Sequence, residues 1–340
     1  MNMNSKTLLA AAGIAAVAFS PAYATEGGDI ATKPGAFIGA SAGVPPPGIY
    51  MFNQVFTYQA NLAGPGTASL NPPGTHKTGV QAAVDVQGFL FVPGWTFLGA
   101  TYDAVIVQPF VMQSVGAPVN AQGSGAFNTY IVPVELSWKL GNSGFAVKTG
   151  VGIYLPDGCT TGANKLGCEA NPYTTYQPEV ILSYLGNGWN LTAAFYEEFN
   201  TANRVTDYTT GNIFHVDLTA TKTIGKWTIG PVAYYVAQVT DDTCSLACGN
   251  FYGTTPAGAL AGHTGRFSDW AVGALVGYDF GPASFSVWAT QEISPKASNA
   301  AAASAASDPS VVAQGATVFA TLSYRLWAPE APVQPAMYHK

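Results

Sequence analysis

A serine between glycines is the most reactive-looking pattern in this sequence. Residues 39–43 read Gly-Ala-Ser-Ala-Gly and match the Gly-x-Ser-x-Gly pattern of a serine nucleophile. That pattern has chemical meaning at a strand-to-helix turn with His and acid partners. Here it runs into three prolines at 45–47. We therefore interpret it as part of a flexible entry segment.

The histidines match no metal-binding motif, because His76, His215, His263 and His339 are widely spaced. His215 shares a strand face with Asp217 and could pair with it. A catalytic role would also need an activated serine and an oxyanion site, and nothing in the sequence marks one. We predict no metal, no cofactor and no enzyme activity, with a hydrolase as the alternative.

The four cysteines form two close pairs, Cys159 with Cys168 and Cys244 with Cys248. Both pairs lie in expected loops. In an exported chain this spacing predicts two local disulfides. A zinc site would instead need ligands from two distant loops, and no histidine lies close to either pair.

Polar side chains alternate with apolar ones along extended stretches of the chain. Residues 214–221 read Phe-His-Val-Asp-Leu-Thr-Ala-Thr. Since a strand points successive side chains to opposite faces, this stretch has one apolar and one polar face. About twelve such stretches recur between residues 48 and 327, which is typical of a membrane barrel.

The links between these stretches alternate in length. Short turns such as Pro93-Gly94 follow the even stretches, and long polar links such as 60–78 follow the odd ones. Bacterial barrels have even strand numbers, short periplasmic turns and long extracellular loops. We predict an all-β fold, a transmembrane antiparallel up-and-down β-barrel of about twelve strands in the bacterial outer membrane.

The composition agrees with a wall that faces lipid. Charged residues make up 9% of the chain, against roughly 25% in soluble domains. A soluble protein of this kind would expose large apolar patches. The net charge of -6 argues against a nucleic-acid partner, because such partners favour basic patches.

The chain divides into four parts. Residues 1–24 read as a secretory signal with Lys6 before an apolar core and a small-residue cleavage site. Residues 25–47 show no strand period and are a possible lumen plug. The barrel is expected at 48–327, and a proline-containing tail at 328–340 is expected in the periplasm.

The polar faces should point into the lumen, because a basic residue at mid-membrane costs roughly 2–4 kcal/mol and acids somewhat less. In the lumen these groups could contact a passing solute, or they could pair with each other and pack the interior. The predicted lumen residues are Asp85, Asp103, Glu135, Lys148, Gln177, Glu179, His215 and Asp217.

Apolar side chains should correspondingly face lipid. On residues 127–140 this predicts Tyr130, Val132 and Val134 outward, and on the last strand an outward row that includes Val318 and Leu322. Aromatic residues near strand ends fit interfacial girdles. The predicted girdle residues are Tyr50, Tyr58, Trp95, Trp138, Tyr184, Trp189, Trp227, Tyr278 and Trp327.

An ordered set of short motifs resembles the outer-membrane proteins of the phenol-degradation meta-pathway family. The motifs span roughly residues 48–327. They include Tyr130-Ile131-Val132-Pro133, Gly150-Val151-Gly152-Ile153-Tyr154-Leu155-Pro156, Gly188-Trp189-Asn190-Leu191, His215-Val216-Asp217, Gly277-Tyr278-Asp279-Phe280 and Leu322-Ser323-Tyr324-Arg325. The family carries no established catalytic residue, and the two cysteine pairs depart from its pattern.

This resemblance implies transport, with outer-membrane lipid and a small hydrophobic solute as the partners. We expect passive passage of small hydrophobic or aromatic solutes through a narrow, largely occupied lumen. The alternatives are an outer-membrane hydrolase and a structural or adhesive barrel whose loops bind a partner. Solute uptake, lipid hydrolysis or loop-dependent partner binding would distinguish the three. The sequence leaves the oligomeric state open.

Overall fold

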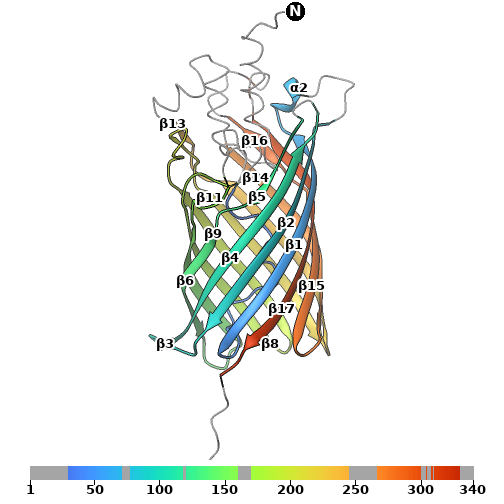
Figure 1. Cartoon of the computed structure of the whole chain (residues 1–340). Helices are drawn as coiled ribbons and strands as arrows, with labels where there is room; N and C mark the ends of the chain where they lie inside the picture. Colours follow the sequence, from blue (N-terminus) through green and yellow to red (C-terminus); the bar gives the residue numbers. More distant parts are fainter. Residues whose placement is uncertain are drawn as a thin grey trace, which may run out of the picture.

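Twelve long antiparallel strands close into a barrel (Figure 1). A computed structural model describes residues 30–70, 77–117, 120–159, 170–244, 266–299, 304, 308 and 310–329. Within these residues the long strands are β1 (Gly48–Ala63), β2 (Gly79–Val92), β4 (Ala100–Val115), β6 (Tyr130–Lys139), β7 (Phe145–Tyr154), β8 (Thr175–Gly186), β9 (Trp189–Asn200), β11 (Ile213–Ile224), β12 (Trp227–Gln238), β14 (Arg266–Asp279), β15 (Ala283–Glu292) and β17 (Val312–Trp327). Each strand pairs with its neighbour in sequence, and β1 pairs with β17 to close the sheet. The predicted fold class is confirmed.

Long and short links alternate around the barrel as predicted. At the short end, Asn187 and Gly188 join β8 to β9 with positive φ angles of 51° and 76°, the backbone geometry that a two-residue hairpin turn requires. The opposite end carries the longer loops and most of the short elements. These elements are α2 (Thr67–Leu70), β5 (Ala121–Ala126), β10 (Tyr208–Thr209), β13 (Thr243–Cys244) and β16 (Lys296–Ser298). The short strand β3 (Thr96–Phe97) lies at the short-turn end instead. No helix among the described residues is long and apolar enough to cross a membrane.

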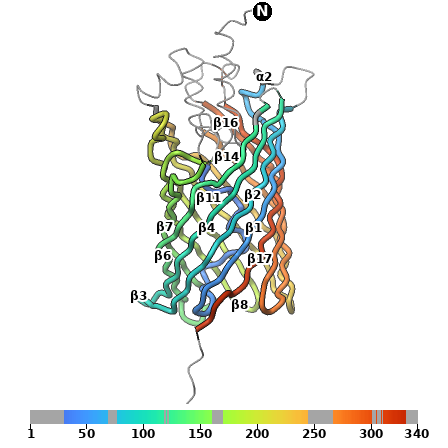
Figure 2. The backbone as a smooth tube through the Cα atoms, in the orientation of Figure 1, coloured from blue at the N-terminus to red at the C-terminus, as the bar shows by residue number. Residues whose placement is uncertain are grey.

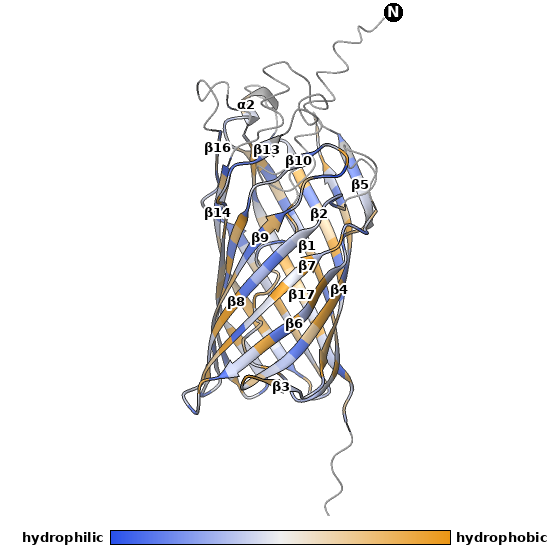
Figure 3. Cartoon of the chain, turned by 90° about the vertical axis from the view of Figure 1, so that its left-hand side faces the viewer, coloured by the Kyte–Doolittle hydropathy of each residue, from blue (hydrophilic) through white to orange (hydrophobic). Residues whose placement is uncertain are grey.

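Hydrophobic and hydrophilic residues alternate along the strands over much of the wall (Figure 3). On β8, Val180 and Leu182 are exposed on the outer face, whereas Gln177 and Glu179 are buried inside. The last strand agrees too, because Val318 and Leu322 are exposed and Phe319 between them is buried. Of the predicted girdle residues, Trp95, Trp189, Trp227 and Trp327 are exposed at strand ends.

A bulge in β6 reverses the expected orientation of its first half. Tyr130 and Val132 are only 4% and 2% exposed, and Glu135 is also buried. The pairing of β6 with β7 shifts register between Ile131 and Glu135. An extra residue at a bulge lets residues on both sides of it face the same way despite their odd separation. The prediction that Tyr130 and Val132 face lipid was therefore wrong.

Strands β1 and β2 turn their apolar face toward the lumen, the reverse of the predicted orientation. Tyr58 is 1% exposed and Val84 is buried on the inner side, so the prediction of Tyr58 as a girdle residue was wrong. Asp85 lies on the outer face with Phe89 and accepts a hydrogen bond from Asn53 Nδ2 at 2.7 Å. Asp85 therefore does not line the lumen, contrary to its prediction. On these strands the inner face is apolar, whereas the outer face mixes polar side chains with exposed apolar ones such as Val55 and Phe89.

Candidate functional site in the lumen

Residues 30–47 run lengthwise through the inside of the barrel (Figure 2). Near the long-loop end, the segment contacts Glu198 at the end of β9. Near the short-turn end, the amide of Ala42 donates to Ser183 Oγ on β8 at 2.8 Å. The segment then reaches Gly48, where β1 begins.

Two inward carboxylates bind the backbone of this segment. Glu198 accepts the amides of residues 31–32 at 3.0 and 2.9 Å, and Asp217 accepts those of Gly35 and Phe37 at 2.8 and 3.0 Å. An irregular segment has no strand partner for these N–H groups, and buried N–H groups need acceptors. Hydrogen bonds to ionised acceptors are among the stronger ones. The polar wall formed by β9 and β11 thus fixes the course of the segment.

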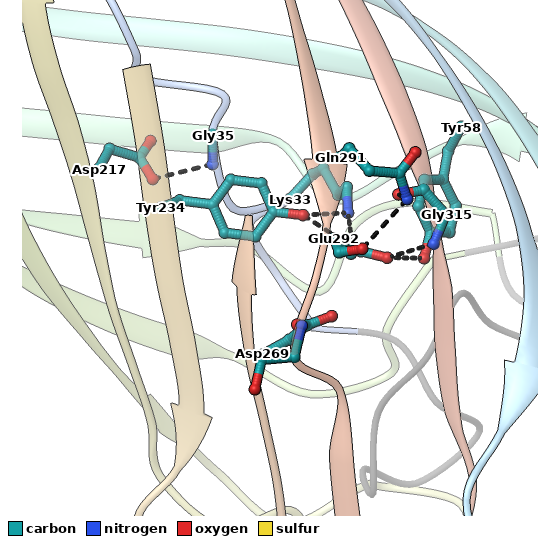
Figure 4. A network of polar contacts seen from close by, with 10 residues as sticks. Lys33, Gly35, Tyr58, Asp217, Tyr234, Asp269, Gln291, Glu292 and Gly315 are labelled. Atoms are coloured by element: carbon teal, nitrogen blue, oxygen red, sulfur yellow. Dashed lines mark hydrogen bonds and ion pairs between the residues drawn. The ribbon is translucent and has the colours of Figure 1, made fainter. Parts of the chain in front are cut away.

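Lys33 makes a side-chain contact with another part of the wall (Figure 4). Its Nζ lies 3.1 Å from Glu292 Oε1 on β15 and 4.1 Å from the centre of the Tyr58 ring. The hydroxyl groups of Tyr58 and Tyr234 donate to Glu292 at 2.6 and 2.7 Å, and the amide of Gly315 donates at 2.8 Å. Glu292 is therefore held by three fixed donors and by one cation from the segment.

Gly35 allows the segment to pass close to the wall. A Cβ at this position would lie 2.9 Å from the Tyr234 ring, and the φ of Gly35 is +88°, a conformation that favours glycine. Trp288 Nε1 donates to the Gly35 carbonyl at 3.0 Å, and Gln54 Nε2 donates to the Ala36 carbonyl at 3.0 Å. The segment is thus bound on several sides.

An apolar chamber of about 470 Å³ remains between the segment and the inner faces of β1 and β2. Phe37 lines it on the segment side. Its wall is formed mainly by the inner faces of β1, β2 and β4, with residues such as Phe52, Phe56, Val84, Val86, Val105 and Val107. Ligand sites are typically mostly apolar cavities of about 300–1,000 Å³, so the chamber has the size and lining for a small hydrophobic molecule.

A second buried network lies on β4, β6, β7 and β8. Lys148 Nζ lies 3.1 Å from both Asp103 Oδ2 and Glu135 Oε2. Glu179 is buried beside them, since a Cβ built on Gly150 would lie 3.0 Å from Glu179 Oε1 and 3.1 Å from Glu135 Cγ. The structure thus brings together four of the predicted lumen residues, with one lysine among three acids.

Three further predicted residues gather next to the segment. Gln177 Nε2 lies 2.7 Å from Thr32 Oγ1 and 3.1 Å from His215 Nε2. His215 Nε2 lies 3.9 Å from Glu198. Asp217 binds the segment instead of pairing with His215. Among the described residues, no group of three His, Cys, Asp or Glu side chains is arranged to hold a metal ion.

Three lumen residues, Lys33, Glu198 and Glu292, were not predicted from the sequence. A signal existed for each of them. Lys33 is the only basic residue of 25–47, and Glu198 and Glu292 each continue the inward-facing period of their strand. Their partners were not visible, because these contacts join residues more than 160 positions apart.

Several predictions fall on residues that the structure does not describe. The signal at 1–24 and most of the tail at 328–340 lie outside the described residues. Cys168 and Cys248 also lie outside them. Both disulfides therefore stay predictions.

The chain matches a protein family in sequence and an outer-membrane channel in structure. The family model described as "Putative MetA-pathway of phenol degradation" matches residues 59–307. No curated protein sequence gives a significant match. The COG4313 outer membrane channel from Pseudomonas putida F1 is similar in structure, with a TM-score of 0.65 and 10% identity over 86% of this chain and 99% of that chain.

Two other solved barrels are more loosely similar. The β domain of the Bordetella autotransporter BrkA gives a TM-score of 0.44 at 13% identity, covering 82% of this chain and 100% of that chain. A deletion mutant of the monoaromatic hydrocarbon channel TodX gives 0.40 at 8% identity, covering 92% and 98%. These two likenesses are too weak to carry an argument. The outer-membrane barrel fold and the outer-membrane location predicted from the sequence are confirmed.

Proposed function

The chain belongs to the phenol-degradation MetA-pathway family, and from this we propose that it lets small hydrophobic or aromatic solutes pass passively through the outer membrane. The observation that supports this most directly is the apolar chamber inside the barrel. Membrane barrels usually have a polar interior. An apolar inner wall on β1, β2 and β4 favours a hydrophobic solute, which water hydrates poorly.

Passage requires no covalent step. A solute that enters the chamber gains roughly 25 cal/mol for each Å² of apolar surface removed from water. A small aromatic ring therefore binds weakly and leaves again, which suits diffusion down a gradient. Side chains such as Phe52 and Val86 would select against polar solutes, because polar groups without hydrogen-bond partners are costly to bury.

Residues 30–47 act in this proposal as a plug that narrows the lumen. The carboxylates of Glu198 and Asp217 and the contact of Lys33 with Glu292 hold the segment in place. Ions need a continuous hydrated path, whereas a hydrophobic solute can move along the apolar side. We expect little open conductance together with measurable uptake of small aromatic solutes.

Uptake by proteoliposomes tests the proposal. Val86→Phe fills part of the chamber and should slow toluene uptake several-fold. Val180→Phe makes the same change on the outer face of β8, where Val180 is exposed, and should leave uptake unchanged. Equal uptake by the two variants would contradict a route through the chamber. Lipid hydrolysis by the purified protein would support the hydrolase alternative.

Deleting residues 28–44 tests the plug. Because the deletion removes the contacts with Glu198, Asp217 and Glu292, conductance in planar bilayers should rise from near zero to clear single-channel steps. A large steady current from the intact protein, without preference for hydrophobic solutes, would instead indicate a general porin.

A further inference from the structure

The outer wall has a polar stripe on strands β1 and β2. The stripe consists of the outward side chains Asn53, Thr57, Gln59, Gln81, Asp85 and Gln87. Elsewhere the outer face is mostly apolar in the middle of the strands, as with Val180 on β8 and Val272 on β14, with Gln108 on β4 as a polar neighbour of Gln87. The stripe therefore interrupts the apolar belt over two adjacent strands.

Asp85 has exposed apolar neighbours on both sides, one of them within the stripe itself. Asp85 pairs in register with Val55 on β1 and with Phe110 on β4, and these side chains are 44% and 45% exposed. On the other side of β1, Val55 pairs in register with Ala320 of β17. Polar groups facing lipid tails are unfavourable, and a charged one especially so. This surface therefore calls for a polar partner.

The chemistry of the stripe is self-complementary. Amide side chains both donate and accept hydrogen bonds, and the Asp85 carboxylate accepts them. One amide hydrogen of Asn53 is used on Asp85 at 2.7 Å, which leaves the second hydrogen and the carbonyl oxygen for another molecule. The stripe carries an acid and no base, so an anionic lipid headgroup fits it poorly.

We propose that the β1–β2 polar stripe is the surface through which two copies of this chain associate side by side in the outer membrane. A two-fold axis parallel to the barrel axes brings the same surface of each copy together. Amides of one copy then reach the amides and Asp85 of the other. Polar groups that would face lipid become hydrogen-bonded between two proteins, as is common in membrane interfaces.

This association leaves both lumens intact. The inward side chains of the same strands, such as Phe56 and Val84, line the chamber and do not take part. The exchange of faces on β1 and β2 thus has two separate consequences, an apolar chamber inside and a polar contact surface outside. The proposal does not rest on the transport function.

Cysteine crosslinking in membranes tests the contact. Thr57 is exposed on the outer face of β1, so Thr57→Cys should give a covalent species of twice the chain mass on oxidation. Val180→Cys on the far wall and the unmodified chain are the matched controls and should give none. The absence of this species, or a crosslinked product of another mass, would overturn the proposal, the latter in favour of a different protein partner.

Native mass spectrometry of the protein in nanodiscs provides a second measurement. The unmodified chain should be mainly dimeric, and Asn53→Leu with Asp85→Leu should make it mainly monomeric. Uptake of toluene should be unchanged in this double variant, because both residues lie outside the lumen. A monomeric unmodified chain, or a double variant that stays dimeric, would refute the proposal. If the double variant does not fold, the crosslinking result decides alone.

Discussion

The contact between Lys33 and Glu292 offers a direct way to loosen the segment inside the barrel. The Lys33→Met change keeps the length of the side chain but removes its charge. The Glu292 side chain is only 1% exposed, and the two atoms of the pair are 3.1 Å apart. With Met at position 33, the seated segment would cover an uncompensated carboxylate. Release of the segment would let water reach Glu292, so the variant should favour the released state.

The size of this effect follows from the contacts that remain. Removing one partner of a buried ion pair costs about 3–5 kcal/mol. Tyr58, Tyr234 and the Gly315 amide still donate to Glu292, so we expect the lower end, about 3 kcal/mol. At about 1.4 kcal/mol for each factor of ten, the ratio of released to seated segment should rise about a hundredfold.

Single-channel recording in planar bilayers measures this ratio as open time. Lys226→Met is the matched control, because Lys226 lies in an exposed turn outside the lumen. Adding Glu292→Gln to Lys33→Met should cost less than the sum of the two changes, since the two residues share one interaction. Equal open times in Lys33→Met and Lys226→Met would refute the role given to Lys33.

Four other predictions concern stability, covalent structure and assembly. Gly150→Ala should lower the stability of the barrel by about 1–3 kcal/mol, because the new Cβ would lie 3.1 Å from Glu135 and 3.0 Å from Glu179. Gly79→Ala is the control and should be tolerated, because the nearest atom to its new Cβ is 4.0 Å away. The temperature at which each barrel loses its shifted mobility on a gel compares the two variants. Lys148→Met should cost about 3–5 kcal/mol, because Asp103 and Glu135 lose their cation, and an unchanged unfolding temperature would count against the network. Mass spectrometry of the unreduced protein should find the disulfides Cys159–Cys168 and Cys244–Cys248, and four free thiols would exclude them. Leu322→Asp with Tyr324→Asp should block membrane insertion by placing acids on the outer face of β17, so normal insertion would contradict the importance of this row.

Asp85 and Glu198 show where reasoning from the sequence stops. Both are acids within alternating stretches, yet Asp85 faces outward and Glu198 faces inward. Alternation defines two faces of a strand but does not say which face is inside. The usual rule places polar groups toward the lumen, and β1 and β2 break it. The bulge in β6 is a second limit of a different kind, because one extra residue at Pro133 and Val134 reverses the orientation of the residues before it.

The sequence by itself indicated about twelve strands, the order of short and long links, the closed barrel and its place in the outer membrane. These properties follow from local periodicity and turn residues, which act over a few positions. Only the tertiary structure decided the path of residues 30–47, the pairing of Lys33 with Glu292 and the position of the chamber. Those contacts join residues far apart in the chain, such as Lys33 and Glu292. They exist only after closure of the barrel brings distant strands around one segment.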